Sequence, residues 1–394
     1  MSKIGISKKL LETRREKIRE YAEKKNYEGM VFFNSISIYY LTGYHFIPTE
    51  RPIAFVLPTN AEPWFFVPRL EQEHLIEKLP EFGREVYFEY PDEKHPAKLF
   101  VQRLEEKKLL KNTIALESRS FPAYWGYEGP LLTDLIGNTC SVEMISDLIR
   151  NMRKIKDKEE IELIRISAKY GDLAHRLLQK YTKEGANEVN VAMQASMEAS
   201  KTMIRDLEGF TPRSILPARA GYRGQIGVWS AIPHSVIENA VFHKGDVLVT
   251  GAGADVAGYQ SELERTMFIG KPSEKQKKYF ELMKKAQDVA INMLQPSNTC
   301  SDVDKAVIKV YKEAGINNLR LHHTGHAIGL EGHEAPFLDI GIKEKIQPGM
   351  VFTCEPGIYE YNFGGFRHSD TVLVTEDGPE LITTYPRELK DLII

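Results

Sequence analysis

The chain changes character near Arg153, and this change constrains its fold more than any other feature. Before it, short apolar runs at residues 29–33 and 53–57 alternate with helix-periodic segments such as 10–25, a pattern typical of an α/β layer domain. After it, a charged run begins in which Asp157 can cap a long amphipathic helix. With 394 residues the chain can hold two domains. We predict one over residues 1–154 and a second over 155–394.

The second domain carries a loose internal duplication. In each half, a long helical segment leads through a short polar stretch, 187–192 in one half and 301–306 in the other, into another helix. Strand-rich segments accompany both halves, at 246–269, 350–359 and 371–375. Two such halves would bury one curved sheet beneath four helices, giving an α/β (α+β) fold with an internal pseudo-twofold axis; chance similarity is the alternative.

The composition of the chain limits the partners that it can bind and the cellular compartment in which we expect it. A formal net charge of -3 argues against a nucleic acid or an anionic membrane as partner. No apolar run approaches the roughly 20 residues that span a bilayer, and the charged N-terminal stretch does not resemble a signal peptide. Three scattered cysteines, Cys140, Cys300 and Cys354, are too few for a disulfide framework. We therefore expect a cytoplasmic protein.

The segment from His322 to Pro336 is the strongest candidate for chemistry. It holds four of the chain's eleven histidines, separated by glycines: His322, His323, His326 and His333. Glycine punctuation predicts irregular backbone, where functional side chains are common, and imidazole suits metal binding and proton transfer near neutral pH.

Three glutamates lie in strand-like sequence. Glu355 ends an apolar run before a Pro-Gly turn, where a carboxylate is costly unless it is paired, metal-bound or protonated. Glu262 and Glu264 are two residues apart, so a strand would place both on one face, where they repel unless a cation joins them. The alternatives are an edge position for Glu355 and a solvated face neutralised by Arg265 for the other two.

These residues together resemble the superfamily of creatinase, prolidase, aminopeptidase P and methionine aminopeptidase. The resemblance rests on an ordered set of motifs: Pro233-His234, Gly258-Tyr259-Gln260-Ser261, Thr324-Gly325-His326, His333-Glu334-Ala335-Pro336 and Cys354-Glu355-Pro356-Gly357. The first domain resembles the creatinase-type N-terminal domain through residues 38–43 and 50–52. The resemblance implies a "pita-bread" catalytic domain and a homodimer.

Metallopeptidases of this superfamily hold two metal ions with five side chains. Carried over by motif, three ligands fall on Glu262, His326 and Glu355, whereas the first aspartate falls on Gly251 and the last glutamate on Ser369. We therefore expect no two-metal site. Any single ion would be held weakly by the three remaining ligands, and Asp255 or Asp370 are the substitutes that a local shift could bring in.

Creatinase works without a metal, and the run Leu263-Glu264-Arg265-Thr266 resembles its strand. On this resemblance His234 is the general base, Glu264 and Glu355 polarise the substrate, and His326 and His333 orient it. Arg51, from a partner subunit, would bind the substrate carboxylate, with Glu262 and Tyr259 completing the binding site. His333 departs from this pattern, because creatinase has arginine there.

The prediction is a metal-independent, creatinase-like hydrolase of a C–N bond in a small carboxylate-bearing substrate, with no cofactor. Two alternatives stay open. One is a metal-dependent Xaa-Pro dipeptidase or aminopeptidase. The other is a catalytically silent binding protein on the same fold.

Overall fold

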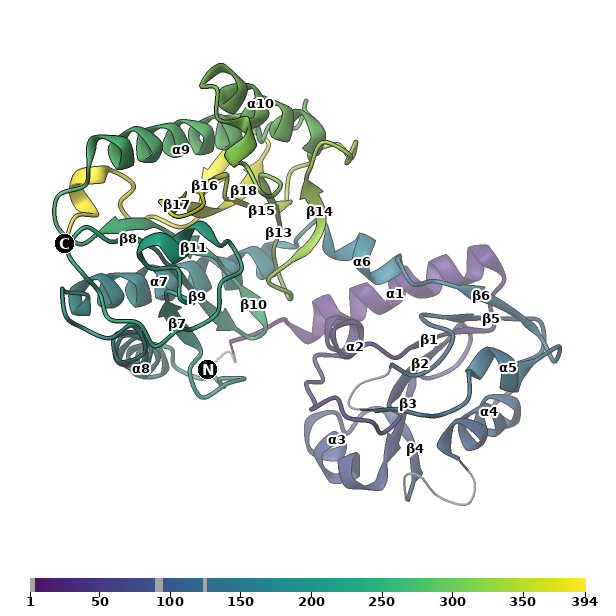
Figure 1. Cartoon of the computed structure of the whole chain (residues 1–394). Helices are drawn as coiled ribbons and strands as arrows, with labels where there is room; N and C mark the ends of the chain where they lie inside the picture. Colours follow the sequence, from purple (N-terminus) through teal and green to yellow (C-terminus); the bar gives the residue numbers. More distant parts are fainter. Residues whose placement is uncertain (1–3, 89–94, 123–125) are drawn as a thin grey trace. The chain divides into compact units, whose positions relative to one another are not determined.

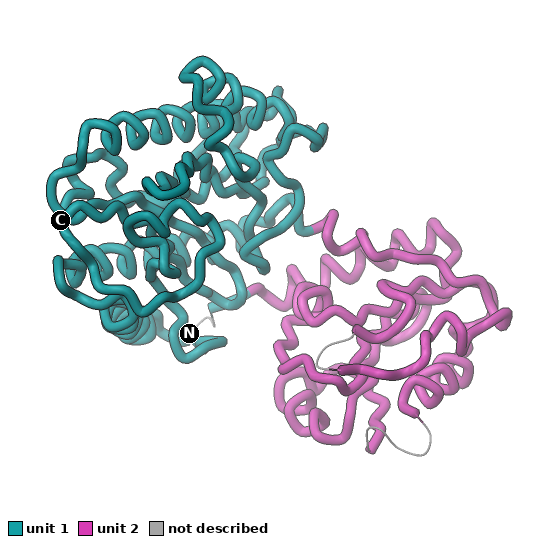
Figure 2. The backbone as a smooth tube through the Cα atoms, in the orientation of Figure 1, with its two compact units in different colours: residues 1–5, 153–394 teal, residues 6–152 magenta. Residues whose placement is uncertain are grey.

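The computed structural model describes residues 4–88, 95–122 and 126–394. It divides into two compact units, residues 6–152 and residues 1–5 with 153–394 (Figure 2). None of the helices in the described part of the chain is long and apolar enough to cross a bilayer.

The smaller unit is built on one mixed six-stranded sheet. Its strands run in the order β4-β3-β2-β1-β5-β6, with β1, β2 and β3 antiparallel and the flanking pairs parallel. Ser7 accepts a hydrogen bond from the Leu10 amide at the start of α1, where the sequence predicts a helix. The strands are β1 (Gly29–Phe32), β2 (Ala54–Pro58), β3 (Trp64–Pro68), β4 (Gly83–Tyr87), β5 (Thr113–Leu116) and β6 (Ser141–Met144). The helices are α1 (Lys8–Lys25), α2 (Ser35–Thr42), α3 (Gln72–Lys78), α4 (Pro96–Glu106), α5 (Leu132–Ile136) and α6 (Leu148–Arg153), with a 3-10 turn at Arg69–Glu71.

The larger unit contains the two predicted helix pairs. They are α7 (Lys158–Tyr181) with α8 (Glu188–Asp206) and α9 (Glu274–Met293) with α10 (Cys300–Glu313). In Figure 1 the first pair lies along β7 and β9, and the second pair lies on the side of β13 to β18. The second helix of each pair is capped by a polar side chain, Asn187 for α8 and Thr299 for α10.

A nine-stranded sheet joins the two halves. Its order is β10-β9-β11-β18-β15-β13-β14, with β7 beside β9 and β19 beside β18. Strand β11 is therefore central: it pairs with β9 on one side and with β18 on the other. The strands of the sheet are β7 (Ala218–Gly221), β9 (Gly251–Val256), β10 (Tyr259–Gln260), β11 (Leu263–Glu264), β13 (Gly325–Ala327), β14 (Glu334–Leu338), β15 (Val351–Cys354), β18 (Ser369–Thr375) and β19 (Gly378–Leu381).

Two short two-stranded sheets complete this unit. Strand β8 (Val247–Val249) pairs with β12 (Thr266–Phe268), and β16 (Gly357–Glu360) pairs with β17 (Gly364–Arg367). Short 3-10 turns lie at Gly227–Ala231, Asn317–Leu319 and Leu389–Asp391. Strands β15 and β18 are buried along almost their whole length, and α9 packs against β15.

Candidate metal centre

Three carboxylates converge at the middle of the nine-stranded sheet. Glu264 lies in β11, Glu262 directly precedes that strand, and Glu355 directly follows β15. One oxygen of each carboxylate lies within 4.8 Å of the others. The sheet order brings them together, because β11 and β15 both pair with β18.

His326, in β13, points its Nε2 at these carboxylates. Its Nδ1 lies 3.1 Å from the Ala327 carbonyl oxygen, which can only accept, so the proton of the neutral ring belongs on Nδ1. Its Nε2 lies 3.1 Å from Glu355 Oε1 and 4.0 Å from Glu262 Oε2, but it is buried without a properly oriented hydrogen bond to any described residue. A neutral His326 would thus face two anions with a lone pair, an arrangement that a cation between them would stabilise.

The pKa values of the cluster show that it attracts positive charge, which in the absence of another cation is a proton on His326. Burial, and then the charges of Glu355 and Glu264, raise the pKa of Glu262 to about 7. Burial alone would lower the pKa of His326, but its contact with Glu355 and the charge of Glu262 raise it to about 9. Burial alone would raise the pKa of Glu355, but His326 lowers it to about 2. The cluster thus attracts positive charge.

The donors present fit a divalent metal ion. Carboxylate oxygens and imidazole nitrogen are the ligands that such ions take in proteins. A histidine ligand usually donates its other ring nitrogen to a carbonyl oxygen, as Nδ1 of His326 is placed to do. His333 offers a further nitrogen within 4.8 Å of the other donor atoms in a group with Glu262 and His326, and its ring stacks on that of His326 with centroids 3.8 Å apart.

Arg367, at the end of β17, is a site residue that the sequence reasoning missed. Its Nη2 donates to Glu264 Oε1 over 2.7 Å, its Nε donates to Glu264 Oε2, and its Nη1 donates to the Tyr359 hydroxyl over 2.9 Å. Burial would lower the pKa of this arginine, but Glu264 and Tyr359 raise it. The only sequence signal was an arginine in an otherwise apolar and glycine-rich strand.

Arg265 does not neutralise the Glu264 carboxylate, contrary to one expectation from the sequence. Its side chain is fully buried and donates to Asp370 over 2.8 Å. Asp370 in turn accepts from Gln287 and Thr383, which leaves it committed to a buried network. Asp255 accepts from the Gly258 amide in a turn. These contacts argue against the expectation that Asp370 or Asp255 could substitute for a missing metal ligand.

The remaining predicted residues lie in different surroundings. His234 is close enough to His333 for their charges to interact. The Tyr259 hydroxyl donates to Glu160 of α7 over 2.8 Å, and its side chain is buried, so it acts as a packing residue here rather than lining the cluster. Arg51 belongs to the smaller unit, where it pairs with Glu50 at 2.6 Å.

Glu188, the first residue of α8, anchors the segment that carries His234. Its carboxylate accepts from the backbone amides of Gly224, Glu238 and Ala240 at 2.9 to 3.1 Å. The side chain is buried, so three backbone donors depend on it. Nothing in the sequence links residue 188 to residues 224–240.

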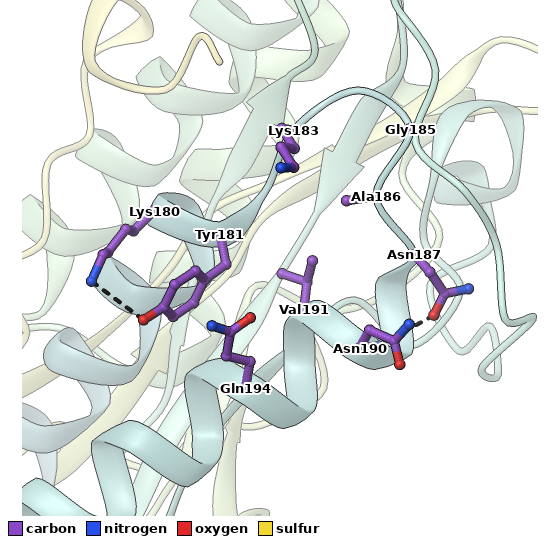
Figure 3. Close-up of a pocket in the computed structure, with 9 residues that line it drawn as sticks. All are labelled: Lys180, Tyr181, Lys183, Gly185, Ala186, Asn187, Asn190, Val191 and Gln194. Atoms are coloured by element: carbon purple, nitrogen blue, oxygen red, sulfur yellow. Dashed lines mark hydrogen bonds between the residues drawn. The ribbon is translucent and has the colours of Figure 1, made fainter.

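A separate pocket lies between the end of α7 and the start of α8 (Figure 3). Its lining includes Lys180, Lys183, Asn187, Asn190 and Gln194. Among the described residues that line it, none has a carboxylate or imidazole side chain. The pocket therefore lacks the donors found at the carboxylate cluster.

Two family models match the chain. Residues 162–376 match metallopeptidase family M24, and residues 14–155 match the creatinase/prolidase N-terminal domain. An Xaa-Pro dipeptidase of Pyrococcus furiosus is 29% identical over 388 residues, which cover 96% of this chain and 100% of that protein.

Solved structures agree with this assignment. Prolidase from Thermococcus sibiricus is 28% identical, with a TM-score of 0.80 over 97% of this chain and 98% of its own. A dipeptidase of Mycobacterium ulcerans is 25% identical, with a TM-score of 0.82 over 99% of this chain and 100% of its own.

These matches correct two expectations. The prediction of a metal-independent, creatinase-like hydrolase is wrong, because the matching family is one of metallopeptidases and the relatives are named Xaa-Pro dipeptidases and prolidases. The prediction that no cofactor is needed is wrong for the same reason. The metal-free prediction rested on the missing ligands at Gly251 and Ser369 and on the creatinase-like run at residues 263–266, whereas the remaining donors converge on a buried histidine nitrogen. The chain is a C–N hydrolase with a creatinase/prolidase N-terminal domain, and it belongs to metallopeptidase family M24.

Proposed function

We propose that this protein is a metal-dependent peptidase that cleaves dipeptides of the form Xaa-Pro. One observation carries the proposal: Glu262, Glu355 and Nε2 of His326 converge in a partly buried cluster that fits a divalent ion. The printed names of full-length relatives supply the substrate class.

A divalent ion held in such a site would supply Lewis-acid chemistry, polarising the carbonyl of the scissile bond and lowering the pKa of a water molecule. The residues of the chain supply the rest. Glu262, His326 and Glu355 would hold the ion, and Arg367 keeps the carboxylate of Glu264 in a fixed orientation.

His333 and His234 are the candidates for proton transfer. His333 is exposed and stacks against His326, and the exposed His234 lies within electrostatic range of His333. We propose that this pair delivers a proton to the leaving nitrogen, because an exposed imidazole can exchange protons with solvent near neutral pH.

Two further features belong to the proposal. We infer a homodimer in which Arg51 reaches the neighbouring active site, as the family resemblance implies. We also infer a cytoplasmic location, which the free thiols of Cys140, Cys300 and Cys354 support.

The test uses metal-stripped full-length protein assayed with Ala-Pro, Ala-Gly and Pro-Ala. We expect cleavage of Ala-Pro only, restored by Mn²⁺ or Co²⁺ and abolished by a chelator. Failure to cleave any Xaa-Pro dipeptide after loading with each of these ions would contradict the proposal.

A further inference from the structure

Glu264 lies in the sheet between Gly251 and Ser369, the two positions where the metal-binding pattern of the family has a carboxylate and this chain has none. In β11 it lies directly opposite Ser369 of β18. On the other side, Leu263 lies opposite Ala252 of β9, so Glu264 is next to Gly251 across that pair of strands. A Cβ atom added to Gly251 would meet Glu264 Oε1 at 3.8 Å, its nearest neighbour in that space.

We propose that Glu264 is a metal ligand, supplying from the central strand the carboxylate that positions 251 and 369 do not. The inference rests on the proposed metal-dependent function and names the side chain that completes its ion site.

Three observations support ligation by Glu264. Its oxygen lies within 4.8 Å of oxygens from Glu262 and Glu355. Its bidentate contact with Arg367 uses one lone pair on each oxygen and leaves another on each, since a carboxylate has about four acceptor sites. Nε2 of His326 is fully buried and faces Glu355 and Glu262 at 3.1 and 4.0 Å, without a well-oriented hydrogen bond to a described residue, and so marks the same place as a site for a cation.

Ser369 contributes through another residue. Its hydroxyl donates to Glu262 Oε1 over 2.8 Å. A serine here is therefore an orienting donor for the Glu262 carboxylate, whose second oxygen remains directed toward His326 at 4.0 Å. If Glu264 supplies the ligand and Ser369 orients Glu262, a carboxylate at position 369 is not required.

The alternative is that Glu264 serves only as the counter-ion of Arg367. The two roles predict different metal affinities for a variant in which β9 carries the carboxylate in place of β11. Gly251 has no positive φ and its side-chain direction is open except for Glu264 itself. The double substitution Gly251→Asp with Glu264→Thr therefore places a carboxylate at the same point from β9 and removes the one from β11.

The experiment measures Mn²⁺ and Co²⁺ affinity of metal-stripped full-length protein by calorimetry, with the Co²⁺ absorption spectrum as a second readout. Glu264→Gln is expected to weaken Mn²⁺ binding by more than about tenfold, because even outer-shell partners of a metal contribute 10–100-fold. The Gly251→Asp/Glu264→Thr variant is expected to recover most of this loss. The matched Gly251→Asn/Glu264→Thr variant, which has the same shape without the charge, is expected to recover none of it.

Circular dichroism and melting curves establish that each variant folds, and Glu360→Gln, at a surface pair with Lys275, controls for the general loss of one carboxylate. Unchanged Mn²⁺ affinity in folded Glu264→Gln would overturn the inference. Equal affinities of the two double variants, one with Gly251→Asp and the other with Gly251→Asn, would overturn it as well. Both outcomes are independent of peptide cleavage by the loaded parent protein, which tests the proposed function alone.

Discussion

Arg367 donates to both carboxylate oxygens of Glu264, from Nη2 to Oε1 over 2.7 Å and from Nε to Oε2. Both side chains are almost fully buried. A buried charge that loses its partner is strongly destabilising, whereas an exposed one is not.

Replacing Arg367 by methionine should therefore reduce the free energy of unfolding by about 3–5 kcal/mol, as expected when one member of a buried pair is removed. Urea denaturation followed by circular dichroism measures this change. Arg165→Met is the matched control. Arg165 likewise donates to both carboxylate oxygens of Glu380, but both of these side chains are partly exposed to solvent. A loss of about 0–1 kcal/mol is expected there; equal losses in the two variants would contradict the prediction.

His326→Asn should weaken Mn²⁺ binding by more than roughly 100-fold, since loss of a ligand exceeds the 10–100-fold effect of an outer partner. The reason is that Nε2 is the imidazole donor buried among the carboxylates. Calorimetric titration of metal-stripped protein measures the change. His323→Asn is the control, because that ring packs edge-on against Phe337; a similar loss in His323→Asn would indicate that the effect is not ligation.

Glu188→Ala should loosen the segment that carries His234 without unfolding the domain. The substitution leaves the amides of Gly224, Glu238 and Ala240 without their acceptor, at about 1–3 kcal/mol for a buried donor. Hydrogen exchange should show faster exchange over residues 224–240. Glu198→Ala, in the same helix but paired with Tyr181 instead, should leave that segment protected.

Glu334 should make the free energy of unfolding decrease in acid. Burial would raise its pKa, but Lys156 at 3.2 Å and Arg153, which also donates to it, lower the pKa below its ordinary value. A carboxyl whose pKa is lower in the folded state stabilises the protein above its unfolded pKa, about 4.3, and loses that contribution as the pH falls through the folded value.

The difference in unfolding free energy between the parent and Glu334→Gln should therefore be greatest near pH 7, at about 3–5 kcal/mol, and shrink below about pH 4.3. Denaturant titrations from pH 3 to 7 measure it. A difference that stays constant across this range would contradict a lowered pKa.

The sequence indicated much of this architecture because its signals are local. The period-two spacing of Glu262 and Glu264 places both carboxylates toward the same cluster. Asp157, which the charged run suggested as a cap, starts α7 and forms a capping box with Glu160. Local pattern does not report partners that come from distant strands. Arg367 lies 103 residues from Glu264, and the adjacent Arg265 turns to Asp370 instead.

The same limit explains the incorrect metal prediction. Comparing positions one by one showed what Gly251 and Ser369 lack, but not that Glu264 lies between them in the sheet. Sheet register is a three-dimensional property, and hydrogen bonding between strands brings together residues from separate parts of the chain.

Strand β11 has a consequence for how such centres evolve. Neighbouring strands lie about 5 Å apart. A longer side chain that leans toward the neighbouring strand can place its carboxylate across roughly that distance. A point in space above β9, β11 and β18 can therefore be served from any of the three. Two substitutions could transfer a ligand from one strand to the next while the ion, the fold and the remaining ligands stay in place. In a relative that lacks a ligand at one aligned position, the ligands should be counted from the side chains that surround the site in space, because a neighbouring strand can supply the missing carboxylate.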